Sequence, residues 1–141
     1  MKEPIIMFIQ ETGETHCILE DKNKSFTGSA YCHPEDMPFA NKLTGSHIAL
    51  TRAYIEYLCY LRNELMTEIK TLKHFYSCIE MHKDFNKEHY TVKSLLRTIN
   101  KLELELSGIR SDIKKEKDCL KTFVKDKNAL YRNLESRRAE D

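Results

Sequence analysis

The residues that could do chemistry are concentrated in "TGSAYCHPEDMPFANKLTGSHIALTRAY", which covers residues 27–54. A cysteine–histidine pair, Cys32 and His33, stands there just before an acidic pair, Glu35 and Asp36. Thiolates and imidazoles are ligands that zinc prefers, and a cysteine beside a base is one arrangement that activates a nucleophile. The stretch therefore raises the possibility of a metal site or of covalent catalysis.

The spacing argues against both. His16–Cys17 and Cys32–His33 are adjacent pairs, and neighbouring residues on a strand point to opposite faces of a sheet. At most one residue of each pair can therefore reach a common metal. No glycine-framed elbow or oxyanion signal accompanies Cys32, and Pro34 with Asp36 is typical of a turn that ends a strand. We expect no metal, no cofactor and no enzymatic activity, with Cys17 and Cys32 as core residues.

Arginines and aromatic rings indicate a different chemistry, the binding of a phosphate-bearing ligand. Arg52 lies near the start of a predicted helix, where free N–H groups and the helix dipole favour an anion. A guanidinium matches phosphate as a planar fork, and aromatic rings stack on bases. For each arginine alone, a solvated surface position is the alternative. As a set, the candidate side chains predict a nucleotide-sized pocket between subunits: Arg52, Phe75, Phe85, Arg97, Asn100 and Arg110.

Three short strands are predicted ahead of these residues. "PIIMFIQ", "HCILE" and "SFTGSAYC" are separated by the polar turns "ETGET" and "DKNK". Turns this short predict an antiparallel meander, and so small a sheet needs another element to cover its apolar face. We expect residues 1–45 to form this meander and its connector.

Two long helices are predicted after the meander, at residues 46–83 and 89–137. Apolar residues recur there in steps of three and four, the heptad signature, from Ile48 to Ile79 and from Val92 to Leu134. Thr44 or Ser46 is expected to cap the first helix. The fold class is therefore α+β: a small antiparallel β-meander followed by two long α-helices that form an antiparallel coiled-coil hairpin in a single domain.

One heptad core position of the first helix is an arginine. An always-charged Arg62 is costly to bury without a partner. We expect it either to pair with Glu64 or Glu116 or to face a polar cavity.

The apolar edge left by two such helices predicts a homo-oligomer, because a single chain has no further helix to cover it. The 141 residues carry 23 basic and 22 acidic residues. Without a basic excess, and with basic clusters interleaved with acids, binding of nucleic acid is not expected. Five cysteines at irregular spacing, no signal peptide and no apolar run of about 20 residues predict a reduced, cytoplasmic protein that is not in a membrane.

Part of the chain resembles small phage-encoded proteins. The pattern runs Gly-x-Ala-x-Cys-x-Pro-x-Asp, then an aromatic residue, a glycine and an Ile-Ala-x-x-Arg-Ala helix start. It is similar to the phage anti-Thoeris signal-sequestering ("sponge") proteins of the first-described type, over roughly residues 5–55. The residues that carry the resemblance are Gly28, Ala30, Cys32, Pro34, Asp36, Phe39, Gly45, Ile48, Ala49, Arg52 and Ala53.

The resemblance implies a non-catalytic anti-defence protein of the host cell cytoplasm. Such proteins bind and sequester cyclic ADP-ribose signals in pockets at subunit junctions. By position, Ala30 is implied as a pocket-lining residue and Arg52 as an arginine contact to the ligand, which would be a cyclic ADP-ribose isomer or a cyclic oligonucleotide. The alternative function is a coiled-coil adaptor or protein-level inhibitor that engages a macromolecular partner through its helical edge.

Overall fold

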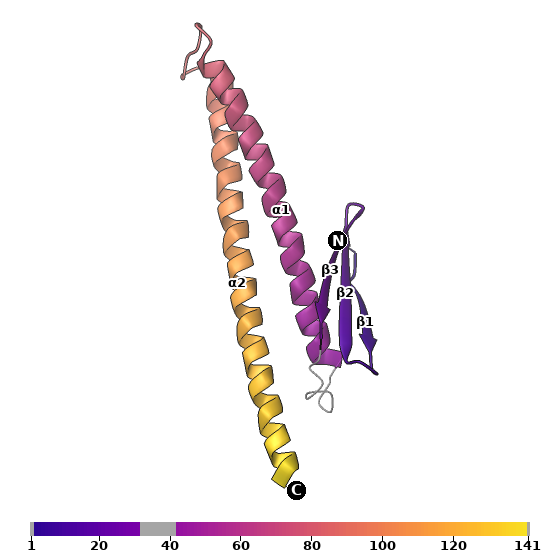
Figure 1. Cartoon of the computed structure of the whole chain (residues 1–141). Coiled ribbons are helices and arrows are strands. Elements are labelled where there is room, and N and C mark those ends of the chain that lie inside the picture. Colours follow the sequence, from indigo (N-terminus) through magenta and orange to yellow (C-terminus); the bar gives the residue numbers. More distant parts are fainter. Residues whose placement is uncertain (1, 32–41, 141) are drawn as a thin grey trace. The chain divides into compact units, whose positions relative to one another are not determined.

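The fold is α+β, as predicted: a three-stranded antiparallel sheet followed by two long helices (Figure 1). The computed structural model describes residues 2–31 and 42–140, and no helix in that part of the chain is long and apolar enough to cross a membrane. The elements in chain order are β1 (Ile5–Ile9), β2 (Glu14–Asp21), β3 (Lys24–Ala30), α1 (Lys42–Glu80) and α2 (Tyr90–Glu140).

The strands form the predicted meander, with β2 between β1 and β3. The turn from β1 to β2 includes Gly13, whose φ of 71° is in the left-handed region that glycine adopts without steric cost. The turn from β2 to β3 has only two residues, Lys22 and Asn23, with φ values of 48° and 66°. Two successive positive φ angles define the type I′ geometry, which matches the twist of the flanking strands.

The two faces of the sheet differ in burial. Side chains at alternate positions of β2, namely Thr15, Cys17 and Leu19, are buried, and their neighbours are only half-buried. The same alternation in β3 buries Phe26, Gly28 and Ala30, which pair with these residues across the ladder. The first turns of α1 cover this inner face, as expected for so small a sheet; their buried residues are Ile48, Ala49 and Ala53.

The start of α1 differs from the prediction. The helix begins at Lys42, so Gly45 and both predicted capping residues, Thr44 and Ser46, lie inside its first turns. The predicted caps are therefore wrong. Gly45 faces the side-chain oxygen of Thr15, and a Cβ at this position would overlap that oxygen. Gly45 thus permits close packing of the helix on the sheet, and it does not end a connector.

By its internal contacts the chain divides into two compact units, and the prediction of a single domain stays a prediction. The first unit consists of Met1–Tyr57 and Lys114–Asp141. In it the rings of His47 in α1 and Phe123 in α2 lie 4.3 Å apart, and Tyr131 is buried. This unit therefore combines the sheet, the start of α1 and the C-terminal part of α2.

The second unit, Leu58–Ile113, is helical apart from the connection at residues 81–89. Its buried side chains fall on the predicted heptad positions: Leu58, Ile69, Val92, Ile99, Leu106 and Ile113. Lys73 of α1 and Glu103 of α2 form an ion pair of 2.6 Å. Both of these side chains are largely exposed, so the pair contributes at most about 1 kcal/mol.

Candidate functional site

Residues of the motif meet where β3 packs on α1. Gly28 of β3 lies against the backbone of α1, and a Cβ at this position would overlap the carbonyl oxygen of Ala49 and the amide nitrogen of Ala53. Ala49 and Ala53 are themselves fully buried. The small residues therefore allow backbone-to-backbone contact between strand and helix. Gly28 has no positive φ, so close packing and not backbone freedom accounts for a glycine at this position.

Arg52 lies at the same corner, on the exposed side of the helix. Its guanidinium donates from Nη1 to the backbone carbonyl of Ser29 at 2.6 Å. One turn further along α1, the Oε2 atom of Glu56 accepts from the backbone N–H of Thr27 at 3.4 Å. Residues four apart share one face of a helix, so these two side chains together bond to the outer edge of β3.

Ala30 follows Ser29, whose backbone carbonyl accepts the hydrogen bond from Arg52. It ends β3 and is only 5% exposed, paired with the buried Thr15. The two residues carried over from the resemblance, Ala30 and Arg52, are therefore brought together. In this structure Ala30 is part of the packed interior, and the Arg52 guanidinium is accessible beside it.

A second contact ties α1 to the tip of the sheet. The hydroxyl of Tyr57 donates to Oδ2 of Asp21 at 3.1 Å, and its ring packs edge-on against Phe26. Burial and the hydrogen bond to Asp21 raise the pKa of Tyr57 above its ordinary value, because both disfavour the phenolate. Sequence reasoning missed Tyr57 and Glu56, since both stand outside the residues that the motif marks.

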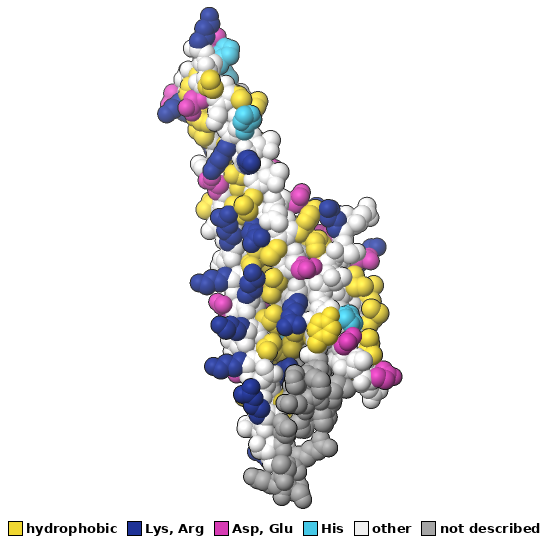
Figure 2. Space-filling view, viewed as in Figure 1, with side chains coloured by type: hydrophobic (Ala, Val, Ile, Leu, Met, Phe, Trp, Pro, Cys, Tyr) yellow, Lys and Arg dark blue, Asp and Glu magenta, His cyan; other side chains and the backbone are white. Residues whose placement is uncertain are grey.

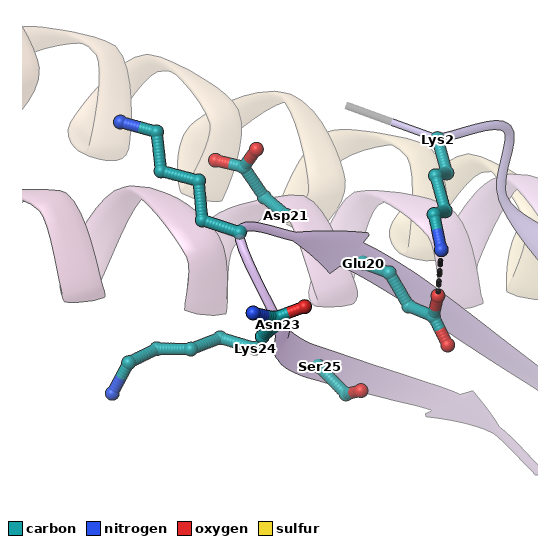
Figure 3. Close-up of a pocket in the computed structure, with 7 residues that line it drawn as sticks. Lys2, Glu20, Asp21, Asn23, Lys24 and Ser25 are labelled. Atoms are coloured by element: carbon teal, nitrogen blue, oxygen red, sulfur yellow. Dashed lines mark ion pairs between the residues drawn. The ribbon is translucent and has the colours of Figure 1, made fainter.

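The tip of the β2–β3 hairpin forms a polar crevice of about 620 Å³ (Figure 3). Lys2 crosses it to Glu20, with 3.6 Å between the charged atoms. Asp21, which also lines the crevice, is engaged by Tyr57. None of the predicted ligand-binding residues lines this crevice. Three lysines and two carboxylates line it, so its surplus is a single positive charge, which is too little to argue for a ligand site.

A second crevice lies at the connection between the two helices, in the second unit. It measures about 490 Å³ and has an apolar wall that includes Ile79, Phe85 and the buried Val92. His82 and His89 line its rim. The ring of Phe85 is held edge-on by Tyr76, with centroids 6.0 Å apart. Phe85 is thus the one predicted site residue among those that line these two crevices.

The remaining predicted residues are exposed on the helices of the second unit. Phe75 is 56% exposed on α1. On α2, Arg97 and Asn100 lie one turn apart and Arg110 follows three turns later, all exposed to solvent. Within the part of the chain that the structure describes, these three α2 side chains have no hydrogen bond or ion pair.

Of the two cysteine–histidine pairs, the structure describes His16 and Cys17. Cys17 is fully buried, and burial raises the pKa of its thiol, which makes it inert. His16 points to the opposite face and contacts Ser29 at 2.8 Å and Glu14 at 3.2 Å. No group of three potential metal ligands occurs in residues 2–31 and 42–140. Cys32, His33, Pro34, Glu35, Asp36 and Phe39 lie outside the described residues.

The side chain of Arg62, at its heptad core position, is half-buried. Its Nε atom lies 3.4 Å from Oδ1 of the neighbouring Asn63. The described contact is therefore with an amide and not with a carboxylate. The predicted pairing with Glu64 has no counterpart among the described ion pairs of the second unit.

Comparison with protein families, with curated proteins and with solved structures gave no match to this chain.

Proposed function

We propose that this protein is a non-catalytic binding protein that captures a cyclic, adenine-containing nucleotide of the cyclic ADP-ribose type. The observation that carries the proposal is the strand–helix corner, where Gly28, Ala30, Ala49, Arg52 and Ala53 converge. These are residues on which the resemblance to the phage anti-Thoeris proteins rests. Their convergence gives an arginine that is fixed in position and open to solvent.

The chemistry of Arg52 fits a phosphate. A guanidinium has five N–H donors, and the Ser29 carbonyl accepts from one nitrogen, Nη1. The contact pre-orients the fork, so less side-chain entropy is lost when a phosphate binds. Capture would be stoichiometric: the protein would hold the signal in the host cell cytoplasm and release it chemically unchanged, as an anti-defence protein of a phage.

A homo-oligomer is part of this proposal. The two helices would pair as an antiparallel coiled-coil hairpin and associate with those of other chains through their remaining apolar edge. The pocket would then receive Arg52 and Ala30 from the corner, together with Phe75, Phe85, Arg97, Asn100 and Arg110 from helices of this chain or of a neighbouring chain.

Calorimetric titration with cyclic ADP-ribose isomers, cyclic dinucleotides and a cyclic trinucleotide tests the proposal. We expect tight binding of at least one of them, weakened about ten- to a hundredfold by Arg52→Ala, the loss of a charge-assisted hydrogen bond. Arg52→Lys should recover only part of the affinity, since lysine lacks the planar fork. Chromatography of the ligand after heat release should return it intact.

Arg132→Ala is the matched control, because Arg132 is exposed on α2 and is not among the predicted ligand residues. Its affinity should equal that of the wild type. Since Arg52 also holds β3, circular dichroism melts must show that Arg52→Ala is folded. No binding across the panel by folded wild-type protein would contradict the proposal.

One observation favours the alternative, an adaptor or protein-level inhibitor. Large apolar side chains are exposed on the helices of the second unit: Met66 is 43%, Phe75 56% and Leu104 75% exposed. A helical surface of this kind can dock a macromolecular partner. Failure of every nucleotide to bind would shift the assignment to this function.

A further inference from the structure

The two edges of the sheet differ in whether other residues bond to their backbone. The outer edge of β3 is engaged by α1, since Glu56 accepts from the backbone of Thr27 and Arg52 donates to that of Ser29. Side chains that bond to an edge strand occupy groups to which another strand would otherwise pair. The β3 edge is therefore protected against strand addition.

The opposite edge has no such protection. Strand β1 pairs only with β2, and beyond that ladder its described bonding is limited to the turn, where Gly13 donates to the carbonyl of Ile9. Nothing else in the described residues bonds to Ile5–Ile9. Along one side of β1, backbone N–H and C=O groups remain available to a further strand.

The side chains of β1 lack the features that normally discourage pairing. Its sequence, IIMFI, contains no charged residue, no proline and no glycine. Ile5 and Met7 are each 50% exposed and Ile9 is 38% exposed. Cross-strand pairing places Ile18 on the same outer face, beside Ile5. Figure 2 shows hydrophobic side chains gathered over this side of the sheet. Strand β1 has five residues, an ordinary strand length, and an exposed, uncharged, apolar edge strand can recruit another strand.

We propose that β1 pairs in antiparallel fashion with β1 of a second copy, about a two-fold axis at Met7, to make a continuous six-stranded sheet. Each Met7 would then lie opposite its counterpart, and each Ile5 opposite Ile9 of the other copy. A further strand is the partner that pairs with the free backbone groups of an edge, and the pattern of β1 favours β1 of a second copy. Every position is large and apolar, so the sequence presents the same surface when it is read in the reverse direction.

The symmetry closes the sheet. A two-fold contact uses the same patch on both copies, so pairing through β1 joins two sheets and no more, because β3, the other edge of the described sheet, is protected. This interface differs from the helical association of the proposed function and does not depend on nucleotide binding.

Cross-linking through a cysteine at the proposed axis tests the pairing directly. Directly opposed residues of antiparallel strands have Cα atoms about 4.5–5.5 Å apart, within the range that a disulfide spans. Under mild oxidation, Met7→Cys should form a covalent dimer whose linkage peptide mapping assigns to position 7 of both chains. Ser25→Cys, exposed on the same face but on the protected strand, should not cross-link. Absence of the 7–7 linkage would overturn the proposal.

Replacing Met7 by a charged residue provides an independent test. Mixing two variants of opposite charge distinguishes loss of pairing from misfolding. Met7→Lys and Met7→Glu each place like charges opposite one another at the axis, so each variant alone should have a lower mass than the wild-type assembly. An equimolar mixture places lysine opposite glutamate and should regain the full mass. Ser25→Lys and Ser25→Glu should behave as the wild type. Unchanged mass in both Met7 variants, or a mixture that fails to regain it, would overturn the proposal.

Discussion

At the scale of single residues, Thr15 is the least expected feature of the molecule. Its side chain is fully buried, and its hydroxyl has no hydrogen-bond partner in the described residues. The oxygen lies against Gly45, which has no side chain to offer it a partner. An unsatisfied buried hydroxyl costs free energy that an apolar group of the same shape does not.

We therefore expect Thr15→Val to raise the free energy of unfolding by about 1 kcal/mol, because it replaces the hydroxyl by a methyl group of similar size. Thr15→Ser is the matched control: it keeps the hydroxyl and deletes the methyl group, and should lower stability by about 1 kcal/mol. Urea unfolding followed by circular dichroism measures both. A clear loss of stability in Thr15→Val would mean that the hydroxyl has a partner.

At the scale of elements, substitution of two glycines tests two different effects: close backbone packing at Gly28 and helix propensity at Gly108. Gly28 contacts the backbone of α1, and nothing lies within 4 Å of a Cβ placed on Gly108 in α2. Gly28→Ala should destabilise the fold by about 3 kcal/mol, because backbone atoms cannot move aside without separating strand and helix. Gly108→Ala should stabilise it by about 0.5–1 kcal/mol through helix propensity alone. Equal effects of the two substitutions in thermal melts would contradict the close approach at Gly28.

The bond between Tyr57 and Asp21, which joins α1 to the hairpin tip, predicts a pH dependence. The pKa of Tyr57 is raised in the folded state, so above pH 10 the unfolded chain loses this proton before the native protein does. The contribution of the neutral phenol is therefore complete below pH 10 and declines as the pH rises toward the folded-state pKa. Tyr57→Phe should lose about 1 kcal/mol at neutral pH and show a shallower alkaline decline. If the free energy of unfolding declined equally steeply with pH in the wild type and in Tyr57→Phe, the decline would not come from Tyr57.

At the scale of the whole molecule, association through the helices stays a prediction that mass measurement decides. One chain has a mass of 16.6 kDa, and we expect light scattering to give a multiple of it. A double variant, Phe75→Glu with Leu104→Glu, puts charge on the exposed apolar surface of the second unit and should reduce that multiple. Ser107→Glu, exposed on α2, should leave it unchanged. A single-chain mass for the wild type would contradict the prediction.

The sequence by itself determined the elements of this protein. Short apolar runs separated by polar turns were sufficient to predict the meander, and heptad spacing was sufficient for two long helices, because both signals are local to the chain. The start of α1 could not be predicted in this way. Thr44 and Ser46 were predicted as caps at the start of the helix, but the helix already includes both, because packing of Gly45 on Thr15 outweighs local preference.

Only the tertiary structure decided what the corner residues do. The motif marked Gly28 and Arg52, but their distances to Ala49 and Ser29 depend on how α1 lies on β3, which no local pattern encodes. The same holds for the difference between the two sheet edges. The sequence makes β1 apolar and β3 largely polar, but it does not show that Arg52 and Glu56, more than twenty residues further along the chain, bond to the backbone of β3.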